Sequence, residues 1–263
     1  MDRLRTPGLV PLILGFYIFV LYAPVLLLPL FSFNDSIYMN FPLQSLTTKW
    51  YVLMIEDTLM MKALWASVKI AVFSAVISTI LGFLAAKAMT RYGMRGRGVI
   101  FGFIMLPLII PSIILGASLL SFFRQFLDIE LTLWTVGSAH VLISIPFSML
   151  VLIARLEGFD RNLEEASYDL GMSTWQTLRR VTLPLAMPGV LASLLLCFLV
   201  SFDEFLKAFF LSGNQPTLPV YMYSLLRFPQ FLPGVLALGS CILVVSAVLV
   251  SIAEWLRRGK DKA

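Results

Sequence analysis

Seven long stretches of this sequence contain no Asp, Glu, Lys or Arg: residues 6–34, 70–86, 98–123, 131–154, 181–202, 208–226 and 228–253. A helix needs about 20 apolar residues to cross the hydrocarbon core of a bilayer. The stretch 208–226 carries Asn214, Gln215, Pro216 and Pro219, so most of it is predicted to be loop. The other six have the length of transmembrane helices or come close to it. We therefore expect an all-α integral membrane protein.

The composition excludes the other broad classes. Of the 263 residues, 59% are hydrophobic and 13% are charged, too apolar for the polar exterior of a soluble domain. Two Cys cannot form a secreted disulfide scaffold, and disorder requires low hydrophobicity. We expect one transmembrane domain over residues 1–263, with six spans at about 9–33, 66–90, 98–123, 132–155, 187–210 and 233–256.

The orientation follows from the Lys and Arg residues, which gather in cytoplasmic loops. With the N-terminus in the cytoplasm, four lie outside: Lys49, Lys62, Arg124 and Arg227. Fourteen lie inside: Arg3, Arg5, Lys87, Arg91, Arg95, Arg97, Arg155, Arg161, Arg179, Arg180, Arg257, Arg258, Lys260 and Lys262. We therefore predict that both termini are cytoplasmic. The formal charge of +5 then reflects membrane topology and anionic lipid, and it does not indicate nucleic-acid binding.

Two further patterns refine the spans. Pro107 and Pro111 are predicted to kink the third span, because proline removes a backbone donor. Residues 49–54 outside the membrane are predicted to form a short interfacial helix with its aromatic side chains at headgroup level. The single histidine, His140, has no cluster of metal ligands beside it and is interpreted as a satisfied core residue, so no metal site is expected.

The inside loop between the fourth and fifth spans is strongly patterned. Asp160 is expected to cap a helix that starts at Arg161 and stops at Gly171 in a left-handed C-cap. A capping box at residues 173–176 then opens a second short helix, which Leu183-Pro184 is expected to end before Pro188 opens the fifth span. One face of the first helix is small to apolar, formed by Leu163, Ala166, Ser167 and Leu170.

The charge of the first helix points to a protein partner. Its residues include four acids and one base: Asp160, Glu164, Glu165, Asp169 and Arg161. Acidic side chains oppose attraction to anionic lipid, so a partner with a basic groove explains them better. The alternative is a solvated helix pair that lies on the lipid surface.

The same loop resembles the cytoplasmic signature of ABC-importer permeases. That signature runs Glu-Ala-Ala, three residues, Gly, nine residues, Ile, one residue, Leu-Pro. Here Glu165-Ala166-Ser167 is followed at the same spacing by Gly171, Val181 and Leu183-Pro184. The resemblance therefore implies the six-helix fold of a type I ABC importer permease.

In that family the loop, here residues 157–186, is the coupling helix that docks into a groove of a separate ATPase subunit. By resemblance Glu165 faces the ATPase or holds the loop, Ala166 and Ser167 permit close approach, and Gly171 makes the turn. The resemblance thus implies a set of ATPase-coupling residues: Glu164, Glu165, Ala166, Ser167, Asp169, Gly171, Leu183 and Pro184.

Most of the chain is similar to the spermidine/putrescine branch of these permeases, through residues 48–51, 155–160, 169–171, 201–205 and 217–221. The resemblance implies a bacterial inner-membrane protein that pairs with a second, homologous permease, two ATPase copies and an extracytoplasmic binding protein. The chain has no Gly-x-x-x-x-Gly-Lys-Ser/Thr loop. We therefore expect no cofactor in this chain, with ATP and Mg²⁺ bound by the ATPase, and no enzymatic activity.

Asp203, Glu204 and Lys207 are the charges placed deepest in an apolar run. Asp203 is expected about 22 Å along the fifth span, past the membrane midplane, where charged side chains are typically functional. We predict that these three residues belong to the substrate path, with Asp203 attracting a cationic amine. The alternative is a pairing of Lys207 with Asp203 or Glu204 within one helix.

The path residues leave the substrate class open. A polyamine follows from the resemblance, whereas an acid and a base side by side also suit a zwitterionic amine such as an amino acid or opine. An ion-coupled secondary transporter is the rival from another class, which predicts internal repeats and broken half-helices. An intramembrane enzyme would need a nucleophile beside a base, which the sequence does not offer.

Overall fold

The computed structural model describes residues 9–92 and 95–260, with side chains for 10–92 and 95–248. Arg3, Arg5 and Lys262 lie outside the described residues, and of Arg257, Arg258 and Lys260 only the backbone is described. Within these limits the regular structure is helical, with one isolated bridge between Asn34 and Leu46. The elements are α1 (Leu9–Ser32), α2 (Lys49–Glu56), α3 (Thr58–Arg91), α4 (Arg97–Ile109), α5 (Ser112–Ser121), η1 (Phe122–Phe126), α6 (Leu133–Glu157), α7 (Asn162–Asp169), α8 (Thr174–Thr177), η2 (Leu178–Thr182), α9 (Leu183–Phe202), α10 (Leu206–Leu211), α11 (Leu218–Leu225), η3 (Pro229–Phe231) and α12 (Leu232–Lys260).

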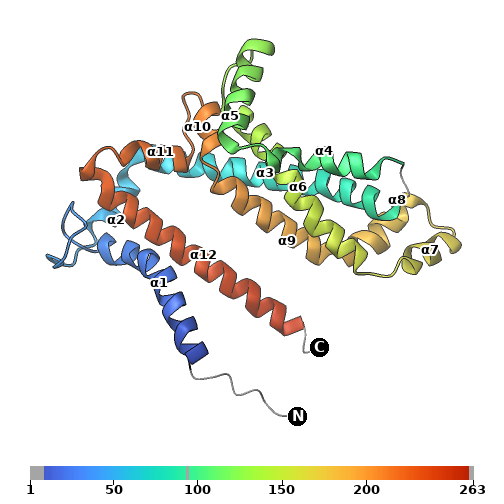
Figure 1. The fold of residues 1–263 in the computed structure, drawn as a ribbon, viewed down its shortest axis with the longest axis horizontal. Helices are drawn as coiled ribbons and strands as arrows, with labels where there is room; N and C mark the ends of the chain where they lie inside the picture. The colour runs from blue at the N-terminus through green and yellow to red at the C-terminus, as the bar shows by residue number, and fades with distance from the viewer. Residues whose placement is uncertain (1–8, 93–94, 261–263) are drawn as a thin grey trace. The chain divides into compact units, whose positions relative to one another are not determined.

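The chain divides into two compact units, one of residues Met1–Met61 with Met222–Ala263 and one of Lys62–Tyr221. In the first unit α12 packs against both α1 and α2 (Figure 1). The most apolar 18-residue window of Val10–Ser32 has a mean hydropathy of 2.3, and none of its residues is buried. A helix that is apolar on all sides is suited to lipid contact, which agrees with its prediction as a span.

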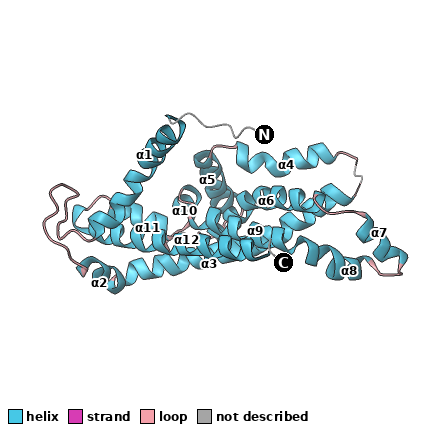
Figure 2. Cartoon of the chain, turned by 90° about the horizontal axis from the view of Figure 1, so that it is seen from below, coloured by secondary structure: helices cyan, strands magenta, loops and turns pink. Residues whose placement is uncertain are grey.

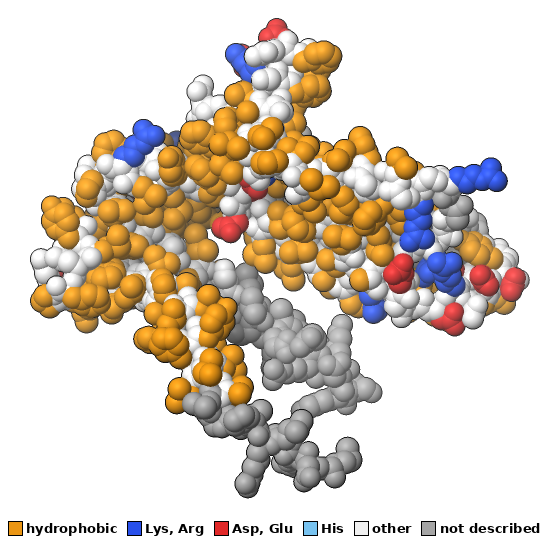
Figure 3. Space-filling model, viewed as in Figure 1, with side chains coloured by type: hydrophobic (Ala, Val, Ile, Leu, Met, Phe, Trp, Pro, Cys, Tyr) orange, Lys and Arg blue, Asp and Glu red, His pale blue; other side chains and the backbone are white. Residues whose placement is uncertain are grey.

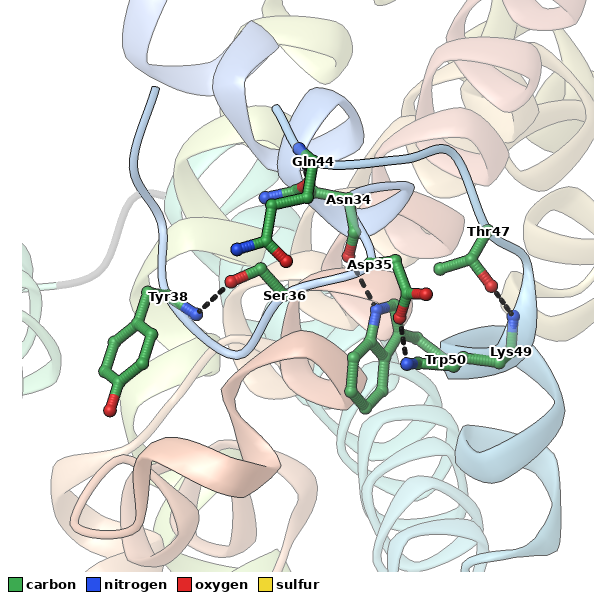
Figure 4. Close-up of polar contacts among 8 residues, drawn as sticks. All are labelled: Asn34, Asp35, Ser36, Tyr38, Gln44, Thr47, Lys49 and Trp50. Atoms are coloured by element: carbon green, nitrogen blue, oxygen red, sulfur yellow. Dashed lines mark hydrogen bonds and ion pairs between the residues drawn. The ribbon is translucent and has the colours of Figure 1, made fainter. Parts of the chain in front are cut away.

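The loop after α1 folds around Asn34 (Figure 4). The Asn34 side-chain oxygen accepts the backbone N–H of Gln44 at 3.0 Å, and its carbonyl accepts the Trp50 indole N–H at 2.8 Å. The predicted helix at residues 49–54 is confirmed as α2, but the Trp50 side chain is buried against the loop. Its indole N–H therefore binds protein in place of lipid headgroups.

The second unit has its core between α3, α6 and α9. Seven buried residues form one apolar cluster: Phe83, Ala86, Met89, Met149, Leu152, Leu156 and Ala186. Small residues allow close helix packing, since a Cβ added to Gly82 would lie 2.2 Å from the Ser148 hydroxyl oxygen. Hydroxyl groups join the helices, with the Ser193 hydroxyl 2.7 Å from that of Ser148.

Five described helices are long and apolar enough to span a membrane by themselves, and α4 with α5 through Phe126 forms a sixth candidate bent by 98°. Within the predicted span at 98–123, the expected proline kink is a full break between two helices, and whether the pair forms one span stays a prediction. Ile110 and Pro111 are extended, with ψ of 127° and 131°. The ring of a proline clashes with the preceding residue in the helical conformation, so Ile110 is extended and the helix breaks before Pro111.

The predicted span at 187–210 also differs from the structure. The helix ends at Phe202, and α10 starts at Leu206 after a short interruption. At the other end, the expectation that Leu183-Pro184 ends a helix is wrong, because helix continues from Thr174 to Phe202. The π-helical turn η2 ends at Thr182, two residues before Pro184. Such a turn already interrupts the regular hydrogen-bond ladder, so the missing proline N–H is tolerated there.

Candidate functional site

The predicted two-helix loop is present at the end of the second unit, where α7 and α8 extend beyond α6 and α9 (Figure 2). Gly171 has φ +79°, as predicted for a left-handed cap. The capping box at α8 is present, with Ser173 N–H bound to the Gln176 side chain at 2.9 Å. α7 starts at Asn162, one residue later than expected, and the Asp160 carboxylate accepts the Asn162 backbone N–H at 3.0 Å.

Glu164 is the buried anchor of this loop. Its carboxylate forms an ion pair with Nε of Arg91 at 2.8 Å, and the side chains are 9% and 7% exposed. The Thr182 hydroxyl donates to the other carboxylate oxygen. Arg91 also donates to the Leu156 carbonyl at 2.9 Å, and its guanidinium lies 4.6 Å from the Phe159 ring centroid. Glu164 therefore holds α7 against α3 and η2.

Two further contacts fix the loop. The Ser167 and Thr177 hydroxyls lie 2.9 Å apart and are buried, which joins α7 to α8. Arg161 donates to the carbonyl of Thr90 at the end of α3. The expected apolar face is thus divided, because Ser167 points into the loop and its three companions are exposed.

The outward surface of the loop is mixed in character. Leu170 is 80% exposed, Trp175 68% and Leu163 48%. Other exposed members of the predicted coupling set are Glu165, Ala166, Asp169, Gly171 and Pro184, whereas Leu183 is half-buried. Figure 3 shows charged side chains around α7 and α8, next to the mostly hydrophobic surface of the membrane helices. Exposed apolar side chains rimmed by charges are typical of a protein-docking surface.

The exit from the loop is fixed by Arg155. Its Nε and Nη2 donate to the Leu185 carbonyl at 3.0 and 2.7 Å. The side chain fits because position 189 is glycine, where an added Cβ would lie 2.6 Å from Arg155 Cγ. The anchoring roles of Arg91, Thr182 and Arg155 were not predicted, because sequence spacing alone cannot pair residues so far apart in the chain.

The predicted path residues surround the break after α9. Asp203 ends that helix and is exposed. One carboxylate oxygen of Glu204 accepts the Lys207 backbone N–H at 3.2 Å. The other oxygen accepts a hydrogen bond from the Lys207 ammonium at 3.0 Å. The Lys207 side chain is 3% exposed and also donates to the Ser112 hydroxyl at 3.0 Å. Lys207 therefore pairs with Glu204.

His140 lies on α6 beside the same region. Its Nδ1 is 2.8 Å from the Ser201 hydroxyl, and its Nε2 is buried with no hydrogen-bond partner among the described residues. The prediction of a satisfied core histidine thus holds for one ring nitrogen. Among the described residues, no three His, Cys, Asp or Glu side chains gather as a metal site would require.

Residues 78–262 match the family described as binding-protein-dependent transport system inner membrane component. This chain belongs to that family. It is 36% identical to the spermidine/putrescine transport system permease protein PotC of Escherichia coli (strain K12), over 92% of this chain and 91% of that protein. It is 34% identical to the putrescine transport system permease protein PotI of the same strain, over 98% of this chain and 93% of PotI. The predicted resemblance is therefore confirmed.

Solved structures show the same fold. A chain of the bacterial ABC transporter that imports the acidic polysaccharide alginate has a TM-score of 0.68 and 18% identity, over 92% of this chain and 93% of that one. A chain of the MetNI methionine ABC transporter gives 0.62 and 19%, over 74% and 92%. The molecule is thus a multi-pass inner-membrane permease subunit of an ABC importer with the type I fold, not an enzyme. The breaks between α4 and α5 and between α9 and α10 are a feature that the ion-coupled rival predicts and that the sequence did not reveal, so family membership, not helix continuity, decides against that rival.

Proposed function

We propose that this permease carries a polyamine, or a related small amine, across a bacterial inner membrane. The observation that supports it is the 36% identity to PotC along nearly the whole chain. Two carboxylates beside the break after α9, Asp203 and Glu204, provide the charge that attracts an ammonium group. Asp203, Glu204 and Lys207 are accordingly the proposed residues of the substrate path.

In the proposed complex this chain, embedded in the lipid bilayer, assembles with two ATPase copies and a second homologous permease. An extracytoplasmic binding protein delivers the amine. ATP and Mg²⁺ bind to the ATPase, which docks on the exposed side of α7 and α8. Both termini lie in the cytoplasm, as the distribution of Lys and Arg indicates. Hydrolysis moves the coupling loop, and the helices then alternate between outward and inward openings.

Partner capture tests the assembly. Tagged chain is purified in detergent from its native membranes, beside a Gly171→Asp variant, and co-purifying proteins are identified by mass spectrometry. We expect an ATPase and a second permease with the unaltered chain, and loss of the ATPase with the variant. A chain that is recovered alone in both cases contradicts the proposed partners.

Uptake assays test the substrate. The complete complex with its binding protein is reconstituted in liposomes that contain ATP, and uptake of labelled putrescine, spermidine and a zwitterionic amino acid is compared. We expect ATP-dependent uptake of the polyamines. Uptake of the amino acid alone would favour the zwitterionic alternative.

A further inference from the structure

The ammonium of Lys207 connects the two helix breaks of the second unit. Glu204 lies in the break between α9 and α10, and Ser112 is the first residue of α5 after the break at Pro111. The Lys207 Nζ is 3.0 Å from a Glu204 carboxylate oxygen and 3.0 Å from the Ser112 hydroxyl oxygen. α5 and α10 pack side by side, as Figures 1 and 2 show. Both interruptions of the spans therefore meet at one buried cation.

The end of a lysine side chain is chemically a butylammonium ion. A carboxylate and a hydroxyl that hold the Lys207 ammonium, with the side chain only 3% exposed, are therefore arranged to bind a primary alkylammonium. Polyamines carry the same group, an ammonium on a chain of methylenes, at each end. The structure thus shows one such group in place, supplied by the protein.

We infer that Glu204 and Ser112 form a binding site for a primary alkylammonium, which Lys207 fills from within the chain in competition with an incoming amine. The site itself follows from the contacts of Lys207. Its use by a transported polyamine rests on the proposed function. The Asp203 carboxylate, exposed at the end of α9, is the neighbouring anion that meets the amine first.

The electrostatics favour an exchange of ammonium groups over an empty site. A buried carboxylate without a counter-ion is strongly destabilising, particularly in a membrane protein. Lys207 supplies that counter-ion when no amine is bound, and replacing its ammonium by that of an amine keeps the Glu204 carboxylate neutralised. An α-amino acid carries a carboxylate two bonds from its ammonium group, and this carboxylate would be repelled by Glu204. The site therefore selects amines whose charged end is followed by methylenes.

Binding of n-butylamine tests the site directly, without transport. The complete complex in nanodiscs is compared as four forms: unaltered, Lys207→Ala, the double variant Lys207→Ala with Glu204→Gln, and Lys69→Ala. Lys69 is an exposed lysine of the same unit, so its removal matches the change in net charge. We expect Lys207→Ala to bind n-butylamine about tenfold more tightly than the unaltered complex, the order of one gained charge-assisted hydrogen bond. The double variant and Lys69→Ala should show no such gain.

A rescue experiment covers the case in which Lys207→Ala fails to assemble. n-Butylamine is then present throughout purification, and assembly should be restored for Lys207→Ala but not for the double variant. Absence of both the gained binding and the rescue would overturn the inference and leave Lys207 as a structural link between α5 and α10. Neither readout depends on which solute is transported. Failure of the proposed function would instead appear as absent polyamine uptake by the unaltered complex.

Discussion

At the scale of single residues, Glu164 and Glu165 are adjacent in the chain but have different roles. Glu164 is buried in an ion pair with Arg91, and Glu165 is exposed on the outer side of α7. Glu164→Gln should lower the stability of the permease by about 3–5 kcal/mol, because it leaves the Arg91 charge buried and unpaired. Glu165→Gln should leave stability unchanged and weaken ATPase capture. Thermal unfolding and co-purification of each variant separate the two effects.

A double variant of the Glu164–Arg91 ion pair provides the control. Glu164→Gln combined with Arg91→Met removes both charges, and the double variant should recover part of the stability lost in Glu164→Gln. Equal unfolding temperatures for Glu164→Gln and Glu165→Gln would show that the buried ion pair does not anchor the loop.

Gly189 is a second residue at which the structure predicts the effect of a substitution on stability. A side chain at this position must displace Arg155 through its Cβ and Cγ, the inner part of the side chain, which has little room to move. Gly189→Val should therefore lower the stability by about 1–3 kcal/mol through overpacking. It should also break the two hydrogen bonds from Arg155 to the Leu185 carbonyl. Gly102→Val is the matched control, because a Cβ there has no neighbour within 4 Å. Thermal unfolding of both variants in detergent, without added denaturant, measures the difference in stability.

At the scale of elements, the turn between α7 and α8 depends on one backbone conformation. Gly171 has φ +79°, and an added Cβ would meet nothing within 4 Å, so the cost of a side chain lies in the backbone alone. Asn tolerates this region and β-branched residues do not. ATPase capture should therefore fall in the order Gly171, Gly171→Asn, Gly171→Val. Equal capture by the Asn and Val variants would contradict the geometry.

Local chemistry explains which elements the sequence could predict. The capping box at Ser173 and the cap at Gly171 are decided by residues within one turn, and both are present. The contact that links the break after α9 to α5 could not be foreseen, because Lys207 donates to Ser112, which is distant in the chain. The anchor between Glu164 and Arg91 depends in the same way on α3 lying beside α7.

At the scale of the whole molecule, the bent pair α4–α5 decides the topology of everything after it. With the N-terminus inside, α1 leads out and α3 leads back. If the pair crosses the membrane, α6 returns the chain to the cytoplasm and places α7 and α8 on the side of the proposed ATPase. If the pair instead re-enters and returns to the same side, the coupling loop faces outward. The inward Lys and Arg residues favour the crossing arrangement.

Cysteine labelling decides between these two arrangements. The two native cysteines, Cys197 and Cys241, are replaced by serine, and single cysteines are introduced by Glu130→Cys, before α6, or Asp169→Cys, at the end of α7. Both positions are exposed, so access to a membrane-impermeant thiol reagent depends on their side of the membrane. We expect outside reagent to label position 130 and to reach position 169 only after the membrane is opened. The reverse pattern would establish a re-entrant pair and remove α7 and α8 from the ATPase, because a loop outside the cell has no ATP-binding partner to move it.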